Sequence, residues 1–228
     1  MLREITSDCV HCGFCLPTCP TYVLWSEEMD SPRGRIRLME ARLDGTAGLS
    51  PTVVEHFDRC LGCMACLTSC PSGVRYDRLI EATRDVVERE VERPRAERLV
   101  REALFRVLPY PRRMRHALRL APLGRVLPAP RALRPLAELA PRWRSAETPP
   151  PRTPAEGESR GTVGILTGCV QSVVFGDVNT ATARVLAADG FDVVAPPQGC
   201  CGALSVHAGR LEEGKALARA LVDSFEGV

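Results

Sequence analysis

The sequence predicts an α+β protein, in which a mainly α-helical domain is followed by part of an α/β domain with a parallel sheet. Apolar residues recur at helical spacing around two cysteine quartets in the first half. A polar, proline-rich segment at 145–160 then reads as an extended linker. After it, short apolar runs alternate with helical patterns. We therefore divide the chain into a helical domain at 1–108, an Arg/Pro-rich connecting segment and linker at 109–160, and an α/β domain at 161–228.

The helices of the first domain are indicated by their end signals. Ser31-Pro32 is typical of an N-cap followed by proline at the first helical position, and Asp44-Gly45 ends that helix. A second helix is expected at 51–58, directly before Cys60. An amphipathic helix is expected at 76–91, and Pro94 separates it from another that ends before Pro109.

The segment 93–144 is basic and amphipathic, with 14 arginines among leucines and valines. We expect short helices that pack on this protein or on a partner, broken by prolines: Pro122, Pro128, Pro130, Pro135 and Pro141. The alternative is an anionic membrane surface. No recognised nucleic-acid motif accompanies the charge, so we expect no nucleic-acid partner.

The second domain shows the order β-α-β-α. Strands are expected at 162–166 and 191–195, and helices at 175–189, where Gly190 ends the pattern, and at 211–225. Helical crossovers between strands give a parallel sheet, and ligands bind at the carboxyl ends of such strands.

The strongest signal in the chain is a motif that occurs twice, C-x2-C-x2-C-x3-C-P. This spacing is the one with which bacterial ferredoxins hold two [4Fe-4S] clusters, the fourth cysteine of each run ligating the other cluster. We therefore expect one cluster on Cys9, Cys12, Cys15 and Cys70, and the other on Cys60, Cys63, Cys66 and Cys19. Zinc is a weaker interpretation because zinc sites usually combine two C-x2-C pairs, and disulfides would need a secreted context.

Composition excludes few function classes. The chain has 228 residues, 45% hydrophobic and 25% charged, and a formal net charge of +2 that favours no particular partner. The 11 cysteines, with no apolar signal region before Cys9, predict a reducing, cytoplasmic location. No apolar run is long enough for a spanning helix, so we expect any membrane contact to be peripheral, at the cytoplasmic face, or through a partner.

A third cysteine group carries a resemblance to a known family. Gly168-Cys169, Gly199-Cys200-Cys201-Gly202 and His207-Ala208-Gly209 resemble the cysteine-rich CCG domain. With the two quartets and Ser31-Pro32-Arg33-Gly34-Arg35-Ile36, the layout is similar to the glycolate oxidase iron–sulfur subunit. The resemblance implies a further cluster site on Cys169, Cys200 and Cys201 in a complete protein. In the family a later C-x2-C pair completes this site, so we expect either a fragment or an incomplete site.

Two other interpretations stay open at these residues. The three cysteines are alternatively buried thiols that pack as small apolar side chains, and His207 is more typical of a core or helix-cap histidine than of a ligand. Arg33, Arg35 and Arg37 either lie near a cluster and raise its potential or form a solvated helix face, the commoner case.

The resemblance implies an electron-transfer subunit of a flavin-dependent glycolate (2-hydroxy-acid) dehydrogenase. The sequence shows no nucleotide fingerprint and no catalytic constellation, so we predict no catalytic residue and expect the FAD on partner dehydrogenase subunits. Electrons would pass through the two [4Fe-4S] clusters to a quinone or another acceptor. The alternatives are a glycerol-3-phosphate dehydrogenase, lactate-utilisation or heterodisulfide-reductase subunit, or a structural or sensing metal protein.

Overall fold

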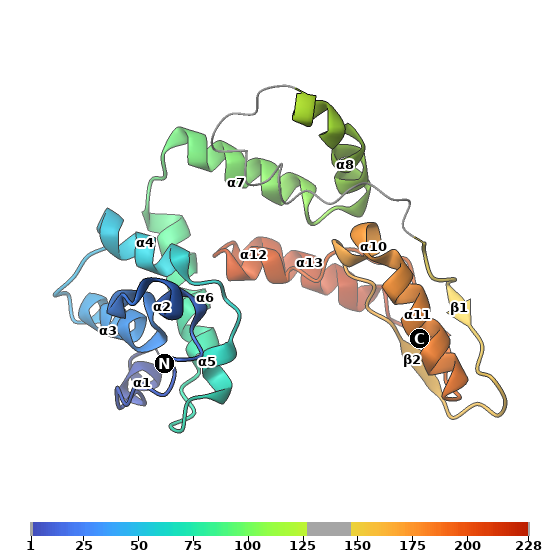
Figure 1. Cartoon of the computed structure of the whole chain (residues 1–228), viewed down its shortest axis with the longest axis horizontal. Coiled ribbons are helices and arrows are strands. Elements are labelled where there is room, and N and C mark those ends of the chain that lie inside the picture. The colour runs from blue at the N-terminus through green and yellow to red at the C-terminus, as the bar shows by residue number, and fades with distance from the viewer. Residues whose placement is uncertain (1, 127–146, 228) are drawn as a thin grey trace. The chain divides into compact units, whose positions relative to one another are not determined.

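The structure is a computed structural model that describes residues 2–126 and 147–227, with the backbone alone at 121–126. It forms two compact units, which we treat separately. The first contains Met1–Arg93 and Leu204–Glu212, and the second contains Pro94–Ala203 and Glu213–Val228. Figure 1 shows the elements of both along the chain.

The described part of the first unit consists of helices and loops, without a strand. Its elements are α1 (Leu2–Ser7), α2 (Pro20–Trp25), the 3-10 helix η1 (Glu28–Asp30), α3 (Pro32–Leu43), α4 (Pro51–Arg59), α5 (Ala65–Thr68) and α6 (Tyr76–Glu90). The expected starts of α3 and α4 are confirmed, since Ser31 Oγ accepts a hydrogen bond from the Gly34 N–H and Ser50 caps α4 in the same way.

The core of the first unit lies between α1, α3, α4 and α6 and reaches the cysteine loops. Phe57 is fully buried, and Leu79 and Ile80 on α6 are each 1% exposed. Cys66 belongs to the same cluster of buried side chains. The cysteine loops are therefore held by packing against helices, as the sequence predicts.

Two long helices open the second unit, α7 (Arg95–Val107) and α8 (Pro111–Val126). The expectation that Pro122 breaks the helix is wrong, because α8 continues through it to Val126. The other breaks, predicted at Pro128, Pro130, Pro135 and Pro141, lie outside the described residues. Within the described residues, no helix combines the length and the apolar character that crossing a membrane requires.

The second unit contains a small mixed sheet in the order β1-β3-β2. The predicted parallel pair is confirmed: β2 (Thr162–Gly164) pairs with β3 (Asp192–Val194), with Val163 opposite Val193. The interpretation of 145–160 as linker alone is wrong, because β1 (Arg152–Thr153) joins the sheet antiparallel to β3. The central strand β3 therefore has a hydrogen-bonded neighbour along each edge, with Thr153 opposite Val193 on one side and Val163 opposite it on the other.

The second unit also contains α10 (Gln171–Val174), α11 (Gly176–Ala188) and α13 (Leu211–Asp223) from Glu213 on, whereas α12 (Ala203–His207) belongs to the first unit from Leu204 on. The order β2, α11, β3, α13 is the predicted one, whereas α10 and α12 were not predicted. Ala183 and Ala187 of α11 pack against Ile165 and Val193, so the helix covers the sheet through small side chains. The sheet thereby fixes where the loops after β2 and β3 begin.

Candidate metal centres

The two cysteine motifs fold into loops with the same backbone hydrogen bonds. In each loop the first cysteine bonds back to the preceding helix, and two further N–H groups bond three residues back. The pairs are Cys9 N–Thr6 O, Leu16 N–Gly13 O and Cys19 N–Leu16 O in the first loop, and Cys60 N–Phe57 O, Leu67 N–Met64 O and Cys70 N–Leu67 O in the second. The repeat in spacing is therefore also a repeat in conformation.

Both loops also turn through the left-handed region at the same two motif positions. His11 and Gly62, each two residues after the first cysteine, have φ of 52° and 64°. Gly13 and Met64, two residues further on, have φ of 87° and 58°. In each loop a glycine occupies one of these two positions without steric strain, and a residue with a side chain occupies the other at a steric cost.

Each loop surrounds a cavity together with the last cysteine of the other motif. The first cysteine cavity is lined by Cys9, Cys12, Cys15 and Cys70, and also by Cys66. The second cysteine cavity is lined by Cys60, Cys63, Cys66 and Cys19. Cys66 thus borders both, and the fold brings together all eight predicted ligands in the two crossed sets.

All eight of these cysteines are free thiols, which fits a cluster better than a disulfide framework. Burial raises the pKa of Cys66 to about 12, and it also raises the pKa of Cys9 and Cys15, with the nearby Cys70 sulfur adding to the rise at Cys9. Among the described residues, no three His, Cys, Asp or Glu side chains converge closely enough for a single metal ion. The thiols stand around cavities, the arrangement that a multi-atom cluster needs.

The first cysteine cavity has a charge pair on its surface side. Arg33 lines it and donates from Nε and Nη2 to the two Glu28 carboxylate oxygens at 2.5 and 3.1 Å. This bidentate pair lowers the pKa of Glu28, and a third bond runs from Arg33 Nη1 to the His11 carbonyl at 3.1 Å. Arg33 is 28% exposed, so water screens much of its field.

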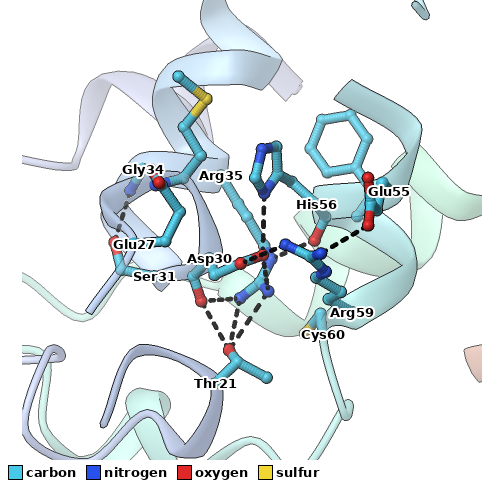
Figure 2. Close-up of polar contacts among 12 residues, drawn as sticks. Thr21, Glu27, Asp30, Ser31, Gly34, Arg35, Glu55, His56, Arg59 and Cys60 are labelled. Carbon is cyan, nitrogen blue, oxygen red and sulfur yellow. Dashed lines mark hydrogen bonds and ion pairs between the residues drawn. The ribbon is translucent and has the colours of Figure 1, made fainter. Parts of the chain in front are cut away.

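A buried charge network adjoins the second cysteine cavity through Arg35, which lines the cavity. Figure 2 shows the polar contacts of this network. Asp30 is fully buried, and its carboxylate accepts from Arg35 Nη2 at 3.3 Å, from Arg59 Nη1 at 3.0 Å, and lies 2.9 Å from His56 Nδ1. Arg35, 1% exposed, also donates from Nε to the His56 carbonyl at 2.6 Å. Arg35 lines the cavity together with the cysteines, and its ion pair with Asp30 fixes the position of its guanidinium.

Two hydroxyl groups lie within hydrogen-bond distance of sulfurs of the second set. Thr21 Oγ1 lies 3.2 Å from Cys19 Sγ, and the Tyr76 hydroxyl donates to Cys60 Sγ at 3.6 Å. Burial raises the pKa of Tyr76 well above its ordinary value, so its hydroxyl keeps its proton. Sequence reasoning missed Thr21, Asp30, His56 and Tyr76, since hydroxyl and charge contacts between distant segments leave no local pattern.

The third cysteine group is also brought together. Cys169, after β2, and Cys200, after β3, have their sulfurs 3.4 Å apart, while Cys201 is exposed. The Cys200 thiol hydrogen-bonds to Cys169 and lowers the pKa of Cys169 to about 6, whereas the same contact and burial raise the pKa of Cys200. The expectation of three buried thiols therefore fits Cys200 alone, which is 2% exposed.

Side-chain amides hold the two loops of this group in register. Gln198 accepts from the Thr167 N–H at 3.0 Å and donates to the Ile165 carbonyl at 2.9 Å. Asn179 of α11 donates to the Thr167 carbonyl at 2.9 Å. Gly202 is required beside the pair, because its φ is 82° and a Cβ there would lie 2.2 Å from the Gly214 carbonyl oxygen.

The remaining sequence candidates lie away from the cysteines. Arg37 is a solvated helix-face residue, 75% exposed and paired with Glu40. His207 ends α12, as a helix-cap residue would, but it is 42% exposed and lies 3.0 Å from Glu81, so a core position is wrong. Of the three arginines, Arg33 and Arg35 are the ones that line the cysteine cavities.

Comparison with known families supports both halves of this description. Residues 5–74 match the 4Fe-4S dicluster domain, and residues 163–228 match the cysteine-rich domain named CCG. The first match covers the loop of each cysteine motif, and the dicluster domain implies two [4Fe-4S] clusters. The eight thiols around the two cavities provide the donor set that such clusters need.

Individual relatives extend the match over nearly the whole chain. The glycolate oxidase iron–sulfur subunit of Escherichia coli (strain K12) is 45% identical over 97% of this chain. The chain is a homologue of the glycolate oxidase iron–sulfur subunits. A Bacillus subtilis (strain 168) protein named probable glycolate oxidase iron–sulfur subunit is 36% identical over 97% of the chain. The chain spans about half the length of these curated relatives, 53% and 54%. No solved structure matches it.

Proposed function

We propose that the chain is the electron-transfer part of a glycolate oxidase-type complex, an oxidoreductase that acts on glycolate or another 2-hydroxy acid. The observation that carries the proposal is the crossed arrangement of eight thiols around two cavities, in a homologue of glycolate oxidase iron–sulfur subunits. In this proposal the chain takes electrons from an FAD on a partner subunit and delivers them to a quinone or another acceptor.

The cysteines divide into two ligand sets in this proposal. Cys9, Cys12, Cys15 and Cys70 hold one [4Fe-4S] cluster, and Cys60, Cys63, Cys66 and Cys19 hold the other. When bound, such clusters accept and donate single electrons. Because each set takes its fourth ligand from the other loop, the two loops have to fold together, and loading with iron stabilises both.

The chain's other residues shape these sites. Helices α3, α4 and α6 pack the loops against the core, which buries Cys66 while Cys12 and Cys63 stay exposed. The Cys66 thiol, whose pKa is about 12, has to lose its proton for ligation, so binding releases protons and weakens at low pH. We assign no catalytic residue to this chain. Cys169, Cys200 and Cys201 remain a proposed third site, whose cluster would need further ligands.

The first test is anaerobic iron and sulfide analysis with EPR of the dithionite-reduced protein. We expect about eight irons per chain and a spin-coupled signal from two reduced clusters. Co-expression with flavin-containing glycolate oxidase subunits should then allow glycolate to reduce both clusters, and the chain alone should not respond to glycolate. Zinc in place of iron, or clusters that glycolate fails to reduce in the assembled complex, would contradict the proposal.

A further inference from the structure

We propose that Thr21, positioned by Arg35, donates a hydrogen bond to the iron-bound Cys19 sulfur and thereby raises the reduction potential of that one cluster. The inference rests on the proposed function, in which Cys19 ligates the cluster of the second cysteine cavity. Thr21 and Arg35 are positioning residues here, since neither is a ligand.

The contact between Thr21 and Cys19 is short and buried. Thr21 Oγ1 lies 3.2 Å from Cys19 Sγ, and the two residues are 2% and 7% exposed. In the structure the Thr21 hydroxyl donates to the Asp30 carbonyl at 2.6 Å, and the Cys19 thiol also points to that oxygen, at 3.6 Å. A sulfur bound to iron has no proton to donate and becomes an acceptor. The Thr21 hydroxyl is then the donor within reach.

Arg35 keeps the free-energy cost of this reorientation of the hydroxyl small. Its Nη1 and Nη2 both donate to Thr21 Oγ1 at 3.3 Å. These two bonds occupy both lone pairs of the oxygen, and the hydroxyl hydrogen can still rotate toward another acceptor. Arg35 Nη1 also donates to the Asp30 carbonyl at 2.5 Å. That carbonyl therefore keeps a partner when the Thr21 hydrogen leaves it for the sulfur, and no buried group is left unsatisfied.

The direction of the effect follows from charge. Reduction adds an electron to the cluster, and hydrogen bonds to the sulfurs stabilise the more negative form, which raises the potential. A hydroxyl that accepts from a buried guanidinium is polarised and donates more strongly. We expect the bond to change the equilibrium for reduction about tenfold, which is about 59 mV for one electron.

The effect should be confined to one cluster. Around the first cysteine cavity, backbone N–H groups of His11 and Arg33 hydrogen-bond to the Cys9 and Cys15 sulfurs, and the side-chain contact to a sulfur is Cys9 Sγ to His11 Nδ1, at 4.0 Å and exposed. The Arg33 side chain donates to Glu28 and to the His11 carbonyl, and its charge acts on Cys15 of the first set. The hydroxyl of Thr21 thus acts on the set that contains Cys19.

The test is a redox titration, followed by EPR, of the iron-loaded protein and four variants. Thr21→Val removes the hydroxyl at constant shape, and Thr21→Ala does so without placing a methyl group against the Asp30 carbonyl. Thr21→Ser keeps the hydroxyl. Thr68→Val is the matched control, because the Thr68 hydroxyl bonds within its own helical turn, to the Ala65 carbonyl at 3.3 Å.

We expect Thr21→Val and Thr21→Ala to lower one of the two potentials by about 59 mV, a tenfold change. Thr21→Ser and Thr68→Val should leave both potentials near those of the unmodified protein. Unchanged potentials in whichever hydroxyl-free variant retains about eight irons, or an equal shift in Thr21→Ser, would overturn the inference and leave the proposed function standing. An unmodified protein without two clusters would overturn both.

Discussion

The two cysteine cavities have the same loops and different surroundings. His11 and Gly62, like Gly13 and Met64, occupy equivalent left-handed positions, and the backbone hydrogen bonds repeat in both loops. The nearby charges do not repeat: Arg33 meets Glu28 at the surface, whereas Arg35 meets a fully buried Asp30. The motif therefore determines the loop, and the packing around it determines the electrostatic environment of each cluster.

This difference should be large in energy. A surface ion pair contributes about 0–1 kcal/mol, because water screens it. Removing one partner of a buried pair costs about 3–5 kcal/mol, because the other charge is left in a low-dielectric environment. The same kind of carboxylate substitution should therefore have very different effects at the two cavities.

The largest effect is expected for Asp30→Ala. It leaves Arg35 buried without its carboxylate and removes a partner from His56 and Arg59, so stability should fall by about 3–5 kcal/mol. The measurement is the Tm of the iron-loaded protein, followed anaerobically by circular dichroism.

The matched control is Glu28→Ala at the first cysteine cavity. Loss of the Glu28 carboxylate should lower the free energy of unfolding by about 0–1 kcal/mol, since Arg33 remains solvated and keeps its bond to the His11 carbonyl. Equal Tm changes in the two variants would contradict the contrast between a buried and a surface network.

The third cysteine group differs from the two cavities, because two of its thiols contact each other directly. The pKa of Cys169, lowered to about 6, makes its thiolate the main form above that pH, whereas an ordinary thiol would need pH near 9.0. Alkylation of Cys169, measured by mass spectrometry, should rise through pH 6 and level off by about pH 7–8. Cys200→Ala removes the hydrogen bond and should move the midpoint toward 9.0.

A Cys169 midpoint near 9.0 in the unmodified chain would contradict this contact. Protection of Cys169 at every pH would point instead to a bound ligand at the third site. Cys201 is exposed and follows Cys200 in the same loop, so its alkylation is an internal reference for access of the reagent to this loop.

Much of the fold could be predicted because its signals are local. Ser31 is a capping residue predicted directly from the sequence, and Gly190 ends α11 with a φ of 88°. The break predicted at Pro122 is wrong, since α8 extends from Pro111 through it to Val126. Strand β1 was missed because two residues of strand in a proline-rich segment carry no periodicity.

The cysteines of the site were predictable and their environment was not. Spacing alone indicated both quartets, while the burial of Arg35 depends on Asp30, His56 and Thr21, which three different segments supply. Exposed arginine is the common case, so the sequence favoured a solvated face for Arg35. The Tyr76 hydroxyl lies near Cys60 only because α6 packs beside the second loop.

Two hydroxyl-deletion variants distinguish crossed ligation of the two clusters from ligation of one cluster by each motif. Thr21 contacts Cys19 of the first motif, and Tyr76 contacts Cys60 of the second. Redox titration of Thr21→Val, Tyr76→Phe and the double variant shows which of the two reduction steps each change moves. If Cys19 and Cys60 ligate one cluster, both variants lower the same step and the double variant lowers it further. If each motif holds its own cluster, the two variants move different steps, and crossed ligation is contradicted.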